Sequence, residues 1–208
     1  AVSGLSISKG DEEFKVIFDL LATLDPDRHH ERMLRFVKIL SGMGCHAYLA
    51  DQMSCEDEKK AFLAIDIMSH IDDPAIAPVL KNSFWRCPRD LQRAMIMVAA
   101  EKAGPDDMPF FSEVLERHKD GTVLKSALLY FGKLGDVGMI FEKVLPMLAH
   151  PYDDVKDAAL DACISVKSEA LNRHFQGLSA DDSELNRMMA DFAMGRSGLS
   201  DHLPHISE

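Results

Sequence analysis

The chain has 208 residues, of which 47% are hydrophobic and 27% are charged, and its formal net charge at pH 7 is −11. These fractions are those of a folded globular protein and exclude an intrinsically disordered one. The acidic balance argues against a nucleic-acid groove, which needs Lys and Arg to neutralise phosphates, and the sequence has no apolar run long enough to span a membrane.

Helical periodicity runs along most of the chain. Apolar residues recur every three or four positions and strand-like alternation is absent, which predicts an all-α protein. The predicted helices are 11–24, 28–41, 45–54, 57–71, a helix capped by Asp73 and opened by Pro74, 89–103, 106–118, 123–134, 137–148, 155–166, 168–177 and 182–194. The helix over 89–103 is apolar nearly all round, so we expect it to be the most buried one.

Residues 121–166 contain the clearest pattern. Three apolar stripes follow one another over 123–134, 137–148 and 155–166, with short turns between them. A helix cannot bury such a stripe alone, and a short turn makes neighbouring helices pack antiparallel. The segment therefore predicts helical hairpins that share one core.

The same segment contains a sequence signature. Residues 127–136 read ALLYFGKLGD, and Asp153, Val155, Lys156 and Ala159 follow where a next unit begins. This resembles the signature of bacterial HEAT repeats, and most closely the short HEAT-like units of the phycobilisome-lyase type. Small residues recur with spacings of 33, 33 and 31 at Ala61, Ala94, Ala127 and Ala158. The resemblance implies a right-handed α-solenoid, or superhelix, of about five to six antiparallel helical hairpins.

A solenoid forms one elongated domain whose terminal hairpins cover the ends of the core. We expect this domain to occupy residues 11–194, between a flexible leader over 1–10 and a flexible tail over 195–208. Its expected parts are degenerate capping hairpins over 11–55, the clearest repeats over 56–178 and a capping helix over 179–194.

The cysteines favour a reducing compartment. Cys45, Cys55, Cys87 and Cys163 are widely scattered, with no Cys-x-x-Cys and no zinc-like spacing. Buried free thiols in a cytoplasmic protein are the expectation. The sequence also shows no nucleophile constellation and no glycine-rich phosphate loop, so we expect neither an enzyme nor a cofactor.

Two patterns invite a metal-binding interpretation. Paired acids at 72–73, 106–107, 153–154 and 181–182 would supply carboxylates, but each pair lies at a predicted helix start, where N-capping is the simpler explanation. His30-Glu31 resembles a ligand pair of HEAT-like iron hydroxylases, which use several such pairs, whereas this chain has one. No metal site is expected.

Basic or ionisable side chains recur where the second helix of each hairpin ends. In a HEAT solenoid these helices line the concave face, so the side chains would form a positive ladder; their alternative role is to offset the helix dipole. The single tryptophan joins this set, because Phe84 already fills the inward position and Trp is a frequent interface anchor, although packing against the next unit would also explain it. The candidate partner-binding residues are Lys81, Trp85, Arg86, Arg117, His118 and Arg173.

The combined expectation is a non-enzymatic scaffold or adaptor that binds another protein on its concave face, through an acidic or phosphorylated segment of the partner. Two alternatives stay open. The lyase resemblance implies a chaperone-like chromophore or cofactor lyase, or a HEAT protein that binds another small ligand on its concave face. The chain would otherwise be a regulatory domain of a larger signalling protein.

Overall fold

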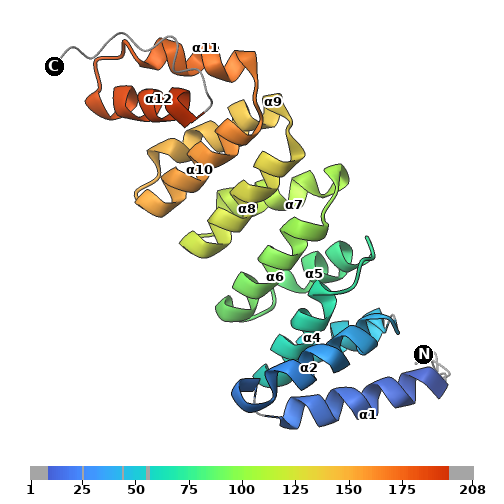
Figure 1. Cartoon of the computed structure of the whole chain (residues 1–208). Coiled ribbons are helices and arrows are strands. Elements are labelled where there is room, and N and C mark those ends of the chain that lie inside the picture. Colours follow the sequence, from blue (N-terminus) through green and yellow to red (C-terminus); the bar gives the residue numbers. More distant parts are fainter. Residues whose placement is uncertain (1–8, 25, 44, 55–56, 197–208) are drawn as a thin grey trace. The chain divides into compact units, whose positions relative to one another are not determined.

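The computed structural model describes residues 9–24, 26–43, 45–54 and 57–196, and all regular structure among them is helical (Figure 1). The prediction of an all-α protein is confirmed. The chain forms two compact units, residues 1–103 and residues 104–208, which we describe one at a time. Most of the predicted leader and tail, 1–8 and 197–208, lies outside the described residues. Lys9 and Gly10, assigned to the leader, instead begin the first helix, and Gly195 and Arg196 end the last one.

The N-terminal unit consists of six described helices. They are α1 (Lys9–Thr23), α2 (Pro26–Ser41), α3 (His46–Met53), α4 (Glu58–Ser69), α5 (Ile76–Phe84) and α6 (Arg89–Lys102). Neighbours in sequence pack together, as α3 does with α4 and α5 with α6. Helices two apart also touch, since α3 packs on α5 and α4 packs on α6.

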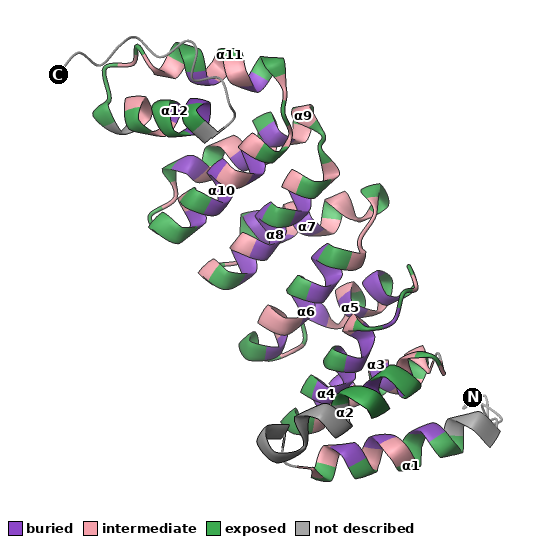
Figure 2. Cartoon of the chain, viewed as in Figure 1, coloured by how far each residue is buried: buried purple, intermediate pink, exposed green. Residues whose placement is uncertain are grey.

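Apolar side chains from successive helices form the core of this unit. Phe14 and Phe18 of α1 are fully buried and both place their rings edge-on to Tyr48 of α3, at 5.5 and 5.4 Å between centroids. The expectation that α6 is the most buried helix is wrong, because 6 of its 14 residues are buried, against 7 of the 14 residues of α8. Exposed positions of α6 are green in Figure 2, and Met97 is 59% exposed. Met97 was counted as a core residue because methionine is hydrophobic, but a hydrophobic side chain does not by itself define a buried helix face.

The start of α5 also differs from the prediction. Asp73 and Pro74 precede the helix, which begins at Ile76 rather than at the proline. The Asp73 carboxylate accepts a hydrogen bond from the backbone N–H of Ala75 at 2.8 Å. An Asx turn of this kind satisfies the backbone locally, and the helix starts two residues later than predicted.

The C-terminal unit continues the helical arrangement. Its elements are η1 (Pro105–Asp107), α7 (Met108–Arg117), α8 (Gly121–Leu134), α9 (Val137–Met139), η2 (Ile140–Val144), η3 (Leu145–Ala149), α10 (Asp153–Ser165), α11 (Glu169–Leu178) and α12 (Glu184–Arg196). Helix α8 packs on α7 and α10, and α11 packs on α12. Helix α10 also contacts η2, η3 and α12, so it lies at the centre of the unit.

The predicted helix over 137–148 is replaced by three short elements. One α-helical turn, α9, is followed by the π-helical η2 and the 3₁₀-helical η3. The physical cause is Pro146, which has no N–H to donate and whose ring clashes with the carbonyl four residues earlier in an α-helix. The apolar stripe survives this change, because Ile140, Val144 and Leu148 are all buried.

Tyr130 joins α7 to α8 and reaches back to the start of the unit. Its ring stacks on Phe111 at 3.9 Å between centroids, and its hydroxyl donates a hydrogen bond of 2.8 Å to the carbonyl of Gly104. Burial raises the pKa of Tyr130 to about 12, and the nearby charges of Asp107 and Asp106 add to the shift. The phenol therefore stays a neutral donor at physiological pH.

The closest helix approach lies between α8 and α10. A Cβ atom added to Gly132 would stand 3.0 Å from the Cα of Ala162 and 3.2 Å from its Cβ. Both contacts are shorter than ordinary van der Waals separation, and one of them is to the backbone. The glycine in the middle of α8 is therefore required by packing and not by backbone conformation.

Two helix ends in this unit share an unusual backbone. Gly135 ends α8 with φ 74°, and Lys167 follows α10 with φ 47°. The two residues lie 32 positions apart, which matches the spacing of the small residues in the helices before them. The left-handed conformation suits Gly but costs a residue with a Cβ about 1 kcal/mol.

The first prediction concerns Gly132. Gly132→Ala would gain helix propensity but must push α10 away, so we expect net destabilisation of about 1–3 kcal/mol. Gly177→Ala is the matched control: it lies in α11 with nothing within 4 Å of an added Cβ, and it should be neutral or stabilising by up to about 1 kcal/mol. Thermal melts followed by circular dichroism compare the two. Equal midpoints would contradict the close approach.

The second prediction uses the two left-handed residues. Lys167→Gly should stabilise the protein by about 0.5–1 kcal/mol by removing the strain, and Gly135→Ala should destabilise it by about 1 kcal/mol. Urea denaturation of both variants against the wild type measures the changes. Stabilisation by both substitutions, or by neither, would show that the two turns are not equivalent.

Candidate functional site

Three of the six candidate residues lie at the end of α5. Lys81 is half-buried in the last turn of the helix, Trp85 is half-buried at its C-cap, and Arg86 is exposed. Phe84 is 1% exposed, and its ring meets that of Trp85 edge-on at 5.1 Å. The prediction that Phe84 fills the core while Trp85 points elsewhere is confirmed.

Hydrogen bonds hold the turn between α5 and α6 in one shape. The side-chain amide of Gln92 in α6 donates to the carbonyl of Phe84 at 3.0 Å, which connects the two helices directly. The backbone N–H of Arg86 donates to the carbonyl of Ser83 at 3.1 Å, and that of Gln92 to the carbonyl of Pro88 at 2.9 Å. Trp85 and Arg86 are thus displayed on a fixed backbone, which lowers the entropy cost of binding.

The positive charge at this turn is larger than the sequence reasoning assumed. Arg89, in the first turn of α6, is exposed like Arg86, and neither guanidinium has an ion-pair partner within the described part of the chain. Arg93, one turn further on, pairs with Asp90 at 2.8 Å. The signal for Arg89 was present in the sequence: a cation directly after Pro88 opposes the helix dipole, so the helix gains nothing from it.

The two candidate arginines of the C-terminal unit are already ion-paired. Arg117 contacts Glu113, and Arg173 contacts Glu169 at 2.7 Å. Each glutamate stands one helical turn before its arginine, the spacing at which opposite charges meet on a helix surface. These two guanidinium groups are therefore largely compensated, unlike Arg86 and Arg89.

His118 has a structural role that the sequence did not reveal. Its Nδ1 accepts a hydrogen bond of 3.1 Å from the backbone N–H of Asp120, so the neutral ring bears its proton on Nε2. The Asp120 carboxylate in turn caps α8, accepting from the N–H groups of Thr122 and Val123 at 3.1 and 3.3 Å. His118 thereby orients the residue that starts the next helix.

A similar turn recurs 32 residues later, at His150. Nδ1 of His150 accepts from the backbone N–H of Tyr152 at 3.2 Å, and His150 lies 32 positions after His118. Both histidines directly follow a second helix of a hairpin and precede a first helix, α8 or α10. Both histidines therefore have a structural role in the turn that precedes the next helix.

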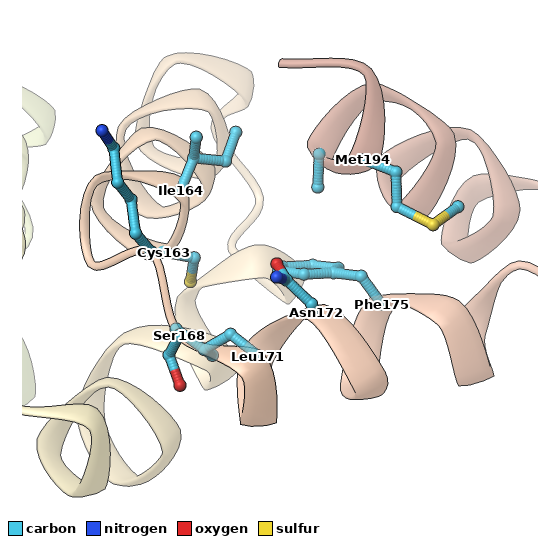
Figure 3. A pocket seen from close by; sticks show the side chains of 9 residues that line it. Cys163, Ile164, Ser168, Leu171, Asn172, Phe175 and Met194 are labelled. Atoms are coloured by element: carbon cyan, nitrogen blue, oxygen red, sulfur yellow. The ribbon is translucent and has the colours of Figure 1, made fainter. Parts of the chain in front are cut away.

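A small cavity surrounds Cys163 (Figure 3). It holds only about 10 Å³ and is lined from α10, α11 and α12, with Cys163, Phe175 and Met194 among its walls. Burial raises the pKa of the Cys163 thiol to about 12. A thiol that stays protonated is a poor nucleophile, so this cysteine packs the core. Cys45 and Cys87 are also free, and Cys55 lies outside the described residues.

The paired acids act on their own backbone. The carboxylates of Asp73, Asp107 and Asp181 accept from the N–H groups of Ala75, Gly104 and Ser183, each at 2.8 Å. The capping interpretation is confirmed for Asp107, which forms a capping box with Gly104, whereas Asp73 and Asp181 bind backbone N–H groups just ahead of α5 and α12. Among residues 9–24, 26–43, 45–54 and 57–196, no three His, Cys, Asp or Glu side chains gather as metal ligands would.

A comparison with known protein families found no family model that matches the chain. Within the described helices, none combines the length and apolar character that crossing a bilayer requires.

The third prediction concerns the turn at His118. His118→Ala removes the acceptor of the Asp120 N–H and should cost about 1 kcal/mol of stability. His118→Asn should recover most of that loss, because an Asn side-chain oxygen accepts from the N–H two residues on in an Asx turn. Chemical denaturation measures both variants. An Asn variant as unstable as the Ala variant would mean that His118 acts through packing instead.

Proposed function

We propose that the chain is a HEAT-like α-solenoid that serves as a non-enzymatic scaffold for other proteins. Three observations support the solenoid. In both units, helices two apart in sequence touch, as α4 with α6 and α8 with α10. Small residues recur with spacings of 33, 33 and 31. The left-handed residues and the histidine turns repeat at 32.

The proposed binding surface of the N-terminal unit consists of Lys81, Trp85, Arg86 and Arg89, which we call the cationic turn. The observation that carries the proposal is the pair of arginines without ion-pair partners among the described residues, which follow a half-buried tryptophan on a hydrogen-bonded turn. Arginine binds carboxylates and phosphates through two parallel N–H donors, and Trp supplies the apolar contact of an interface anchor. An acidic or phosphorylated segment of a partner protein matches both groups.

Arg117 and Arg173 have a smaller part in this proposal. Each must exchange its glutamate for the partner, so the net gain is the difference between two ion pairs of similar strength. His118 is committed to Asp120 through Nδ1 and offers only its Nε2–H. The strongest contribution is therefore expected from the cationic turn.

The fourth prediction tests this ranking with a synthetic acidic peptide that carries one phosphoserine, titrated by calorimetry. The double variant Arg86→Glu, Arg89→Glu should weaken binding by at least about tenfold, because two attractive contacts become repulsive. Trp85→Ala should also lose about tenfold. Arg93→Gln is the matched control, since Arg93 is already paired with Asp90, and its affinity should stay within about twofold.

The opposite result is equally clear. If the double variant binds as the wild type does while Arg117→Glu or Arg173→Glu abolishes binding, the cationic turn is not the site and the paired arginines are. If the wild type does not bind the peptide at all, the acidic-partner proposal fails.

A further inference from the structure

The C-terminal unit contains an apolar cleft that none of the candidate residues lines. Its volume is about 230 Å³, and its walls come from three elements, η3, α11 and α12. The lining residues are Leu145, Pro146, Leu148, Ala149, His174, Leu178, Asn186 and Met189. Most of this lining is hydrocarbon, and the volume exceeds that of one large apolar side chain.

The apolar surface extends from the cleft onto α12. Met189 lines the cleft, whereas Met188 and Phe192 on the same helix are 63% and 53% exposed. At the other side, Phe141 is 37% exposed and meets the ring of the cleft residue His174 edge-on at 5.6 Å. Large apolar side chains that are exposed next to an apolar cleft are typical of an interaction surface.

The charges around the cleft are asymmetric. Asn186 of the lining donates from Nδ2 to the Asp181 carboxylate at 3.2 Å, which places that carboxylate at the edge of the cleft. No basic side chain of the described residues pairs with Asp181. Residues 104–208 as a whole contain 18 acidic and 10 basic side chains, a formal net charge of −8.

The basic side chains beside the lining residues are already engaged. Arg173 pairs with Glu169, and Lys143 pairs with both Glu116 and Glu142. Arg187 donates to the backbone carbonyls of Asp181 and Asp182. Arg187 keeps its positive charge, because backbone carbonyls do not neutralise it, and it balances one of the two carboxylates of Asp181 and Asp182. One negative charge of this pair is left at the edge of the cleft, and the net charge of the unit attracts cations.

We infer that this cleft binds a cationic amphipathic segment of a partner protein. One large apolar side chain, Leu, Met or Phe, enters between η3 and α12, and a neighbouring Lys or Arg pairs with Asp181. This site is separate from the cationic turn and takes a partner of opposite charge, so it goes beyond the proposed function.

The test uses three synthetic peptides of about four helical turns, measured by fluorescence anisotropy on the full chain. The first is an amphipathic leucine–lysine peptide. The second replaces every lysine with glutamate and keeps the apolar face, and the third replaces the leucines with serine and keeps the charge. The wild type should bind the first peptide at least about tenfold more tightly than either of the others.

Variants then locate the site. Met189→Lys and Ala149→Lys should each weaken binding of the leucine–lysine peptide by about tenfold or more, since both put a cation into the apolar cleft. Ala149 is exposed at the mouth, so its variant tests the site without disturbing the core. Asp181→Asn keeps the cap to Ser183 and should cost about two- to fivefold. Leu129→Lys, on the exposed face of α8, is the control and should bind as the wild type does.

Several results would overturn the inference. They are equal affinity for the leucine–glutamate or serine–lysine peptide, unchanged affinity in both Met189→Lys and Ala149→Lys, and no measurable binding of the leucine–lysine peptide. The double variant Arg86→Glu, Arg89→Glu should leave this binding unchanged.

Discussion

The close contact of α8 with α10 determines the geometry of the C-terminal unit. At Gly132 the helices are so close that an added Cβ would stand 3.0 Å from the Cα of Ala162, and the alanines 127, 159 and 162 are buried. Small residues let backbones approach, and tight approach lets many weak dispersion contacts add up. Because α10 also supports η2, η3 and α12, this contact positions two of the three elements that line the apolar cleft. A substitution of one of these small residues would therefore change the shape of the cleft, although none of them lines it.

The two proposed surfaces differ in physical character. The cationic turn relies on directional hydrogen bonds from arginine to an anion, whereas the cleft relies on burying hydrocarbon next to one carboxylate. Residues 1–103 have a formal net charge of −3 and residues 104–208 one of −8. Opposite local charges discriminate between partners by repulsion as well as by attraction. A scaffold with both surfaces would bind two kinds of partner and keep each away from the other's site.

Much of the fold was predictable from the sequence, because helix periodicity and short turns leave few alternatives; the divergent directions of Phe84 and Trp85 followed from the helical rotation per residue. Three further features were also predictable from local rules. Pro146 was a sufficient reason to break the helix over 137–148. Glu113 and Glu169 stand where they would pair with the candidate arginines, and Arg89 opposes a helix dipole. The acceptor role of His118 was beyond reach, because it depends on the backbone angles of the residues around the turn. The cleft was too, because its lining residues from η3, α11 and α12 meet only in the folded unit.

The break at Pro146 has a consequence for how the molecule deforms. Within residues 137–149 the hydrogen-bond pattern changes from α to π to 3₁₀, so no continuous ladder couples one end of the segment to the other. Such a segment yields locally, at a free energy below that of global unfolding, while the regular helices around it stay intact. Since η3 forms one wall of the cleft, this wall deforms more easily than the walls formed by the regular helices α11 and α12. If the cleft binds a partner as we infer, its opening can adjust to side chains of different width, and the proposed surface would tolerate several ligands rather than require a single fixed fit.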